Sequence, residues 1–127
     1  MATITRSRRR QRRYSVSRER SGCVEFEYPS PNGRHYRLAL TNVSASGISF
    51  AIEQDDEELS YLESGANLNR ATVRIGDCMI RGDMVVMHVT SDSESRHICG
   101  ALLYPESDTD LVKLKSVLAG MEAASDD

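Results

Sequence analysis

The chain has 127 residues, of which 39% are hydrophobic and 28% charged; this length suits one domain rather than two independent cores. The formal net charge of −3 hides an uneven distribution. Residues 1–20 hold eight arginines and one glutamate, whereas acidic residues outnumber basic ones in the rest of the chain. This division predicts a basic arm that favours an anionic partner, on an acidic body that repels an extended polyanion such as duplex DNA.

Several classes of protein are disfavoured by the sequence. No apolar run approaches the roughly 20 residues that cross a bilayer, so we expect no membrane contact. The arginine-rich start resembles a transit peptide, but its arginines lie too densely for a clean amphipathic helix. Three cysteines, Cys23, Cys78 and Cys99, fit neither a zinc pattern nor a disulfide framework, so we expect reduced thiols.

Beyond the arginine-rich start, alternation of apolar and polar residues predicts half-buried β-strands. The first strand covers residues 24–28. A turn rich in proline and glycine follows at 29–33, and the returning strand covers 35–40. Residues 41–47 are small and polar, and they lead into a further strand at 48–52.

The second half of the chain opens with an acidic run at 53–58, after which apolar residues predict one short helical turn. Strands resume at 71–75, 78–89 and 96–103. The middle one is long enough to be bent or bulged, and Gly82 is the expected position of the bend.

The apolar spacing then changes to that of an amphipathic helix, capped by Ser107 or Asp108. Its apolar positions are Leu111, Leu114, Leu118 and Met121. Together these elements predict an all-β fold with a C-terminal helix, namely a six-stranded antiparallel, Greek-key-like barrel over residues 14–121. The helix is expected to pack against one open side of the barrel. A flexible arm is expected at 1–13, before this domain, and a disordered tail at 122–127, after it.

The sequence holds little support for catalysis, a metal or a cofactor. No nucleophile stands beside a base in a recognisable motif. The three histidines, His35, His88 and His97, fall on separate predicted strands, where half-exposed structural positions are more common than ligands. The acidic run lacks the alternation and central glycine of a calcium loop, so a solvated loop is the favoured interpretation.

The arm carries the most specific chemistry in the chain, because all eight of its basic residues are arginine. A guanidinium group binds phosphate with two parallel hydrogen bonds, bridges guanine O6 and N7, and stacks on purine faces. The arm therefore favours recognition of planar, phosphorylated groups. The alternative is a disordered tail that binds RNA or acidic surfaces without specificity.

A second motif occupies residues 42–47, Asn-Val-Ser-Ala-Ser-Gly. In extended backbone, Asn42 and Ser44 point to the same face, so an amide and a hydroxyl can meet one ligand edge. Gly47 lets the backbone turn or approach a neighbour closely. The alternative is a plain polar turn between two strands.

Taken together, the two motifs resemble those of the PilZ domain, a bacterial receptor module for cyclic di-GMP. Arg9 to Arg13 forms Arg-x-x-x-Arg, and Asn42 to Gly47 forms Asn-x-Ser-x-x-Gly, in that order along the chain. The family's six-stranded antiparallel barrel, closed by a C-terminal helix, also corresponds to the elements predicted above. The resemblance extends over about residues 6–121 and implies a bacterial, cytoplasmic protein that is not an enzyme.

The resemblance implies a role for each motif residue. Arg9 and Arg13 would hold guanine edges and phosphates from the segment before the first strand. Asn42 and Ser44 would hydrogen-bond a guanine from the barrel surface, and Gly47 would permit the close approach of the ligand.

The density of the arginine run leaves the functional pair open. Two further pairs have the same spacing: Arg6 with Arg10, and Arg8 with Arg12. We favour Arg9 and Arg13 because Arg13 is nearest the first strand, with Arg8 and Arg10 as the next candidates. An arginine just before the motif is associated in this family with a stacked, intercalated ligand dimer. Arg8 stands there, so the resemblance implies two ligands per site.

The resemblance also implies a mechanism in which ligand binding orders the arm and changes contact with an effector protein. One alternative is an RNA- or DNA-binding barrel that uses the arginine arm, although nucleic-acid barrels usually present more aromatic residues for stacking than this chain has. Another is a PilZ-like module that binds no nucleotide and serves only in protein interaction.

Overall fold

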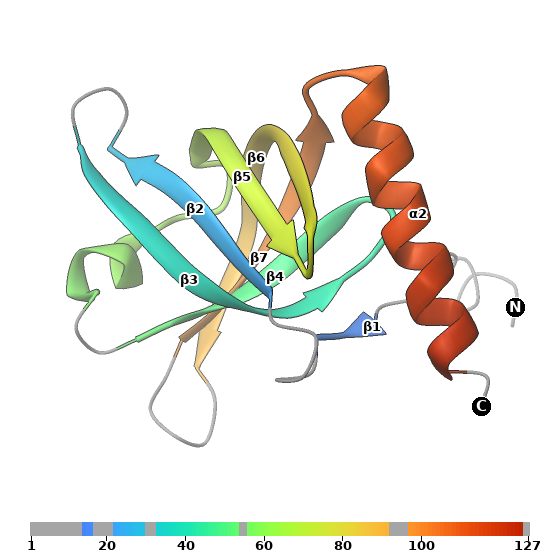
Figure 1. Ribbon diagram of the computed structural model, residues 1–127. Coiled ribbons are helices and arrows are strands. Elements are labelled where there is room, and N and C mark those ends of the chain that lie inside the picture. Colours follow the sequence, from blue (N-terminus) through green and yellow to red (C-terminus); the bar gives the residue numbers. More distant parts are fainter. Residues whose placement is uncertain (1–13, 17–21, 30–32, 54–55, 92–96, 126–127) are drawn as a thin grey trace, which may run out of the picture.

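The computed structural model describes residues 14–16, 22–29, 33–53, 56–91 and 97–125, and Figure 1 shows their arrangement. The strands in chain order are β1 Tyr14–Ser15, β2 Gly22–Tyr28, β3 Arg34–Val43, β4 Gly47–Ile52, β5 Asn67–Ile75, β6 Cys78–Ser91 and β7 His97–Pro105. A short 3-10 helix, η1 (Glu57–Tyr61), precedes β5, and an α-helix, α2 (Asp108–Ser125), follows β7.

The strands form a closed antiparallel barrel. Six of them follow one another in the order β3-β2-β5-β6-β7-β4, and pairing between β3 and β4 completes the circle. β1 pairs with the end of β3 that extends beyond β2. The predicted six-stranded barrel with a C-terminal helix is therefore confirmed. β1 is an additional strand that the sequence did not reveal, because two residues are too few to show an alternating pattern.

The inward-facing apolar residues of the strands fill the barrel. Phe26 lies at the centre of an aromatic cluster, with ring centroids 5.7 Å from that of Tyr36 and 5.6 Å from that of Phe50. All three side chains are buried. Aromatic rings at these separations contribute packing beyond their area alone, so the interior of the barrel is a filled core and leaves function to the outer surface.

Three register shifts interrupt the strand pairing. One lies in β3 between Leu40 and Asn42, one in β5 between Leu68 and Ala71, and one in β6 between Val86 and His88. A shift of this kind inserts one extra residue and turns the following side chains to the opposite face of the sheet.

Gly82 was the expected position of a bend in β6, but the register shift of this strand does not lie there. Gly82 stays in register, paired with Ala71 on one side and Pro105 on the other. A Cβ atom there would collide with the backbone carbonyl oxygen of Tyr104. The glycine is explained by the close approach of β7, and the register shift in β6 lies at Met87 instead.

The start of α2 is joined to the barrel by hydrogen bonds. The side chain of Ser107 accepts a hydrogen bond from the backbone N–H of Asp110 at 3.2 Å and donates one to its carboxylate at 2.6 Å. That carboxylate also accepts a bond from the backbone N–H of Arg81 on β6, at 2.9 Å. Of the two candidate caps, Ser107 is the one used, and Asp110 connects the helix to the strand.

The helix packs against the barrel through part of its predicted apolar face. Leu114 and Met121 are buried, and Leu118 is half-buried together with Val117. Leu111 is exposed, so its predicted place in the buried face is wrong. Asp110 takes the inward position of the first turn instead, because its hydrogen bonds satisfy it there.

The helix also runs further than the sequence pattern predicted. Residues 122–125, which we expected in a disordered tail, continue α2 to Ser125. Alanine and glutamate favour helical backbone, and no proline or glycine follows Gly120 to interrupt it. The last two residues lie outside the described part of the chain.

The predicted helical turn after the acidic run is confirmed as η1. Leu59 within it and Leu62 directly after it are buried, whereas Tyr61 is exposed. These two leucines anchor the turn to the barrel core. Residues 54 and 55, in the middle of the acidic run, lie outside the described residues.

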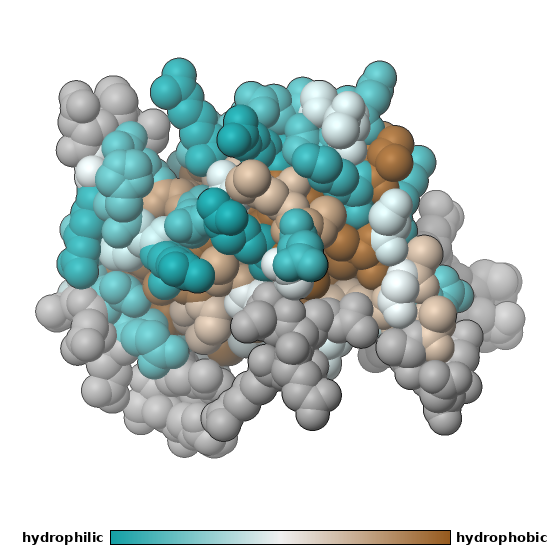
Figure 2. Space-filling view, in the orientation of Figure 1, coloured by the Kyte–Doolittle hydropathy of each residue, from teal (hydrophilic) through white to brown (hydrophobic). Residues whose placement is uncertain are grey.

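The surface in view in Figure 2 is mostly hydrophilic over the strands. Hydrophobic residues are also visible between the hydrophilic ones, both over the barrel and beside α2. On α2, Leu111 and Val112 are exposed. Within the described residues, no helix combines the length and the apolar character that spanning a membrane requires.

The three thiols differ in exposure, which predicts a difference in reactivity. All three cysteines are free; Cys99 is buried, whereas Cys23 and Cys78 are half-buried. Burial raises the pKa of the Cys99 thiol to about 12, so its reactive thiolate is scarce at neutral pH. Under native conditions a colorimetric thiol reagent is expected to modify Cys23 and Cys78, and Cys99 only after unfolding. Rapid modification of all three in the folded protein would contradict this burial.

The Asp110 contact predicts a pH-dependent contribution to stability. The hydrogen bond from the Arg81 backbone, followed by that from Ser107, lowers the pKa of Asp110 below its ordinary value. Its contribution is therefore present at neutral pH and lost as the pH falls through the lowered pKa of the folded state. Asp110→Asn is expected to reduce the free energy of unfolding by about 1 kcal/mol at pH 7. Urea unfolding from pH 7 to pH 3 measures this.

Asp108→Asn provides the matched control for that measurement, because Asp108 is an exposed carboxylate in the same first turn of α2. The gap between the wild type and the Asp110 variant should narrow as the solution is acidified. A gap that stays constant down to pH 3, or an equal loss in the Asp108 variant, would show that the charge of Asp110 is not what joins α2 to β6.

Candidate ligand-binding site

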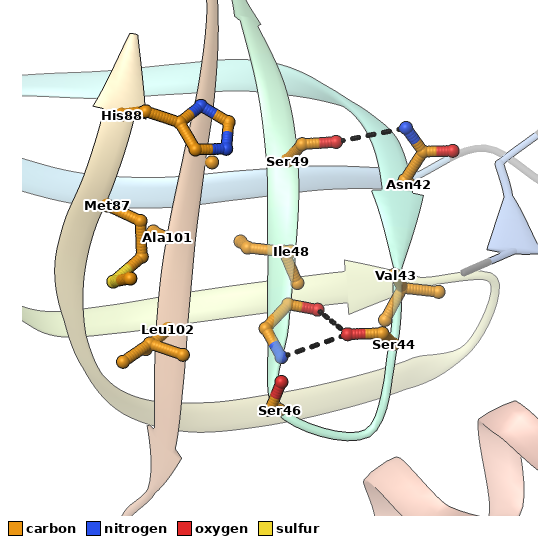
Figure 3. Close-up of a pocket in the computed structure, with 12 residues that line it drawn as sticks. Asn42, Val43, Ser44, Ser46, Ile48, Ser49, Met87, His88, Ala101 and Leu102 are labelled. Atoms are coloured by element: carbon orange, nitrogen blue, oxygen red, sulfur yellow. Dashed lines mark hydrogen bonds between the residues drawn. The ribbon is translucent and has the colours of Figure 1, made fainter. Parts of the chain in front are cut away.

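A cleft of about 210 Å³ opens on the outer surface of the barrel. One side is formed by the end of β3, the turn after it and the start of β4, and the other side by β6 and β7, as Figure 3 shows. Among the described residues that line it there is no aspartate, glutamate, lysine or arginine, and His88 is the one titratable side chain. The cleft thus combines polar and apolar lining residues and carries no acidic or strongly basic side chain, on a body in which acidic residues predominate.

Asn42 reaches this cleft because of the register shift in β3. Leu38 and Leu40 alternate toward the core, and strict alternation would place residue 42 there too. The shift between Leu40 and Asn42 makes Val43 the next buried residue and turns Asn42 outward. A bulge therefore presents a polar side chain at the barrel surface where a regular strand would bury it.

The carboxamide of Asn42 is held between two neighbouring strands. Its Nδ2 donates to the hydroxyl of Ser49 on β4 at 3.2 Å, and its Oδ1 accepts from the hydroxyl of Ser15 on β1 at 3.4 Å. The Ser49 hydroxyl is itself 2.6 Å from that of Thr41. These contacts leave the amide one N–H and one carbonyl lone pair, a donor and an acceptor fixed side by side.

Ser44 lies in the same cleft, in the turn between β3 and β4. The backbone N–H of Ser44 donates to the carbonyl of Gly47 at 2.8 Å. Its hydroxyl lies 3.3 Å from both the N–H and the carbonyl oxygen of Gly47, as the dashed lines in Figure 3 show. The expectation that Asn42 and Ser44 share one face agrees with their positions, since both line the cleft.

Gly47 is explained by packing within the barrel. A Cβ atom at this position would collide with the backbone carbonyl oxygen of Ala101 on β7. The glycine therefore permits the close approach of two strands, a structural role that the sequence offered as one of its possibilities. The close approach of a ligand, which the resemblance implied, stays a prediction.

The candidate arginines of the arm, Arg8, Arg9, Arg10 and Arg13, lie outside the described residues. The segment that follows them is described, and it pairs with two residues of β3 that line the cleft. Tyr14 of β1 pairs with Val43, and Ser15 pairs with Asn42. β1 therefore lies directly beside the first residues of the Asn-x-Ser motif.

Sequence reasoning missed the opposite wall of the cleft. Met87 and His88 are consecutive residues of β6, and both are exposed. The register shift between Val86 and His88 turns both outward, whereas alternation would have placed His88 in the barrel interior with Met84 and Val86. The only sequence signal was a histidine at an otherwise apolar strand position, which is too common to identify a site.

The other two histidines lie outside the cleft. The Nε2 atom of His35 is 3.4 Å from the carboxylate of Glu27, and the Nδ1 atom of His97 is 3.2 Å from the hydroxyl of Ser91. Across the part of the chain that the structure describes, no three histidine, cysteine, aspartate or glutamate residues lie together where they could hold a metal ion.

Comparison with solved structures identifies the fold. The complex of MrkH from K. pneumonia with c-di-GMP superposes with a TM-score of 0.81 at 20% identity, over 93% of this chain and 54% of that one. The PilZ domain of YcgR from Escherichia coli, solved with c-di-GMP, superposes with a TM-score of 0.71 at 15% identity, over 93% of this chain and 94% of that domain. The inhibitor of motility MotI/DgrA from Bacillus subtilis also has a TM-score of 0.71, at 16% identity, over 91% of this chain and 52% of that one.

The chain therefore has the fold of a PilZ domain, as its superposition on the PilZ domain of YcgR shows. It spans about half the length of MrkH and of MotI/DgrA, and nearly the whole of the YcgR domain. No known family model matches the sequence, and no curated protein matches it. The likeness to these solved structures is therefore a likeness of fold.

The packing of Gly47 predicts a large effect from a single methyl group. Gly47→Ala is expected to lower the free energy of unfolding by about 2 kcal/mol, because the added atom forces β4 away from β7. Gly120→Ala is the control: its added methyl group meets nothing within 4 Å on α2 and should stabilise the helix by up to about 1 kcal/mol. Thermal unfolding compares the two variants, and an unchanged melting temperature for Gly47→Ala would contradict this packing.

Proposed function

We propose that this protein is a receptor for cyclic di-GMP. One observation carries the proposal: Asn42 and Ser44 meet in a single cleft, directly beside the strand that continues into the arginine run. The fold and the order of the two motifs support the same function. The solved complexes of MrkH and of the YcgR domain with c-di-GMP make this ligand the first one to test.

The division of charge between cleft and arm suits the chemistry of this ligand, which has two guanines and two phosphates. The described lining residues supply hydrogen-bond donors and acceptors but neither lysine nor arginine. Such a lining can bind guanine edges and cannot neutralise two phosphates. The arginines before β1 provide the missing positive charge, and their forked guanidinium groups bind both phosphates and guanine.

Each motif residue receives a role within this proposal. Asn42 hydrogen-bonds one guanine through the amide N–H and the carbonyl lone pair that its bonds to Ser15 and Ser49 leave free. Ser44 bonds the same guanine through its hydroxyl. Arg9 and Arg13 hold phosphates and guanine edges, with Arg8 and Arg10 as the alternative arginines. Arg8 further favours a ligand bound as a stacked pair.

Signalling follows from where the arm joins the barrel. β1 is only two residues long, so few backbone hydrogen bonds hold the arm's attachment point. Ligand that bridges the arginines and the cleft would order the arm against the barrel, and the new surface would change contact with an effector protein. The protein acts as a non-catalytic cytoplasmic receptor in this account.

Binding of cyclic di-GMP and its loss on substitution test the proposal. Isothermal titration of the full chain is expected to give a dissociation constant of micromolar or lower. Asn42→Ala should weaken binding by about tenfold or more, because a buried guanine edge loses its partners. Arg13→Ala should weaken it at least as much, through the loss of a phosphate or guanine contact.

His35→Ala is the matched control, because His35 is exposed on β3 and lies outside the cleft; its binding should equal that of the wild type. Titration stoichiometry distinguishes one ligand per site from a stacked pair. Undetectable binding of cyclic di-GMP, together with tight binding of single-stranded RNA that weakens steeply with salt, would replace the proposal with an RNA-binding barrel. Absence of both would favour a protein-interaction module.

A further inference from the structure

The imidazole ring of His88 lies against the backbone of the neighbouring strand at Gly100. The two residues are paired between β6 and β7. The three atoms nearest to the place where a Cβ of Gly100 would stand all belong to this ring: Cε1 at 2.6 Å, Nε2 at 2.8 Å and Nδ1 at 3.3 Å. The ring therefore occupies the space that any other residue at position 100 would fill.

The ring is supported on one side and open on the other. Gly100 is buried beneath it, whereas His88 itself is exposed. Figure 3 shows the imidazole extending from β6 across β7, over the wall of the cleft. A planar ring that rests on a glycine loses little further conformational freedom when a ligand covers it, because its orientation is already limited.

The position of His88 complements that of Asn42. Both line the cleft, with Asn42 on the wall formed by β3 and β4 and His88 on the wall formed by β6 and β7. The first wall offers groups that hydrogen-bond the edge of a base. The second offers a flat ring beside the apolar side chains of Met87 and Leu102. A purine needs both kinds of contact, because its edges are polar and its faces are not.

We infer that His88 is the stacking platform for a guanine of the bound nucleotide, and that Gly100 is required to seat its ring. This inference rests on the proposed receptor function and adds a base-stacking residue outside the two sequence motifs. His88 is the one planar ring among the described residues that line the cleft. Stacking of this kind tolerates other flat rings and fails with aliphatic side chains.

The first test compares substitutions of His88 in titrations of the full chain with cyclic di-GMP. His88→Ala is expected to weaken binding about tenfold, the scale of a lost base-stacking contact. His88→Phe keeps a flat ring without hydrogen-bonding atoms, and its affinity should stay within about threefold of the wild type. If His88→Gln retains affinity and His88→Phe loses it, the residue acts as a hydrogen-bond partner, and the stacking role is overturned.

The second test is a double-mutant cycle between the ring and its seat. Gly100→Ala should displace the imidazole and weaken binding in the wild-type background, yet change little in the His88→Ala background, since no ring remains to be moved. Equal losses in both backgrounds would show that Gly100 acts independently of His88. Thermal unfolding of each variant separates this effect from a loss of folded protein.

The third test observes the ring directly by NMR. The chain has three histidines, so their carbon-bound ring protons give few signals, assigned with His35→Ala and His97→Ala. Cyclic di-GMP should shift the ring protons of His88 upfield, because they enter the ring current of the base, and leave those of His35 unchanged. The wild type could bind cyclic di-GMP and lose affinity in Asn42→Ala, yet show no shift of the His88 protons and no loss of affinity in His88→Ala. That result would overturn the stacking role and leave the receptor function standing. No binding by the wild type overturns both.

Discussion

The surface cleft depends on two register shifts in a closed barrel. In β3 the shift after Leu40 turns Asn42 outward, and in β6 the shift after Val86 turns His88 outward. Because the barrel is closed, the flanking strands fix the register on both sides of each shift, and the extra residue has no place in the core. Both shifts therefore release polar side chains to the outer surface, and the two released residues lie in the same cleft.

The same constraint explains why the motif residues are part of the fold as well as of the site. The Ser44 hydroxyl closes the turn into β4, and Gly47 lets β4 approach the backbone of Ala101. Asn42 is bonded to both neighbouring strands through Ser15 and Ser49. A cleft built this way is pre-organised: its polar groups are positioned by backbone pairing before any ligand arrives, which reduces the cost of ordering them on binding.

Much of the fold followed from sequence pattern, and the errors have identifiable causes. The strands and the C-terminal helix were predicted because alternation and helical spacing are strong over most of their lengths. Leu111 was assigned to the core because spacing cannot show that Asp110, satisfied by Arg81 and Ser107, takes the inward position. A bend was expected at Gly82 because glycine often marks an irregular position in a strand, whereas the register shift of β6 occurs at Met87.

The sequence by itself determined the division of charge, the class of fold, and the pair of motifs that points to a nucleotide ligand. These are local or additive properties, set by residue type and short spacing. Only the tertiary structure decided that β1 pairs with β3 at Asn42 and that His88 lies over Gly100 in the cleft that Asn42 also lines. Both depend on pairing between strands distant in sequence and on one-residue shifts of register, which reverse the facing of a side chain without changing the pattern of residues around it.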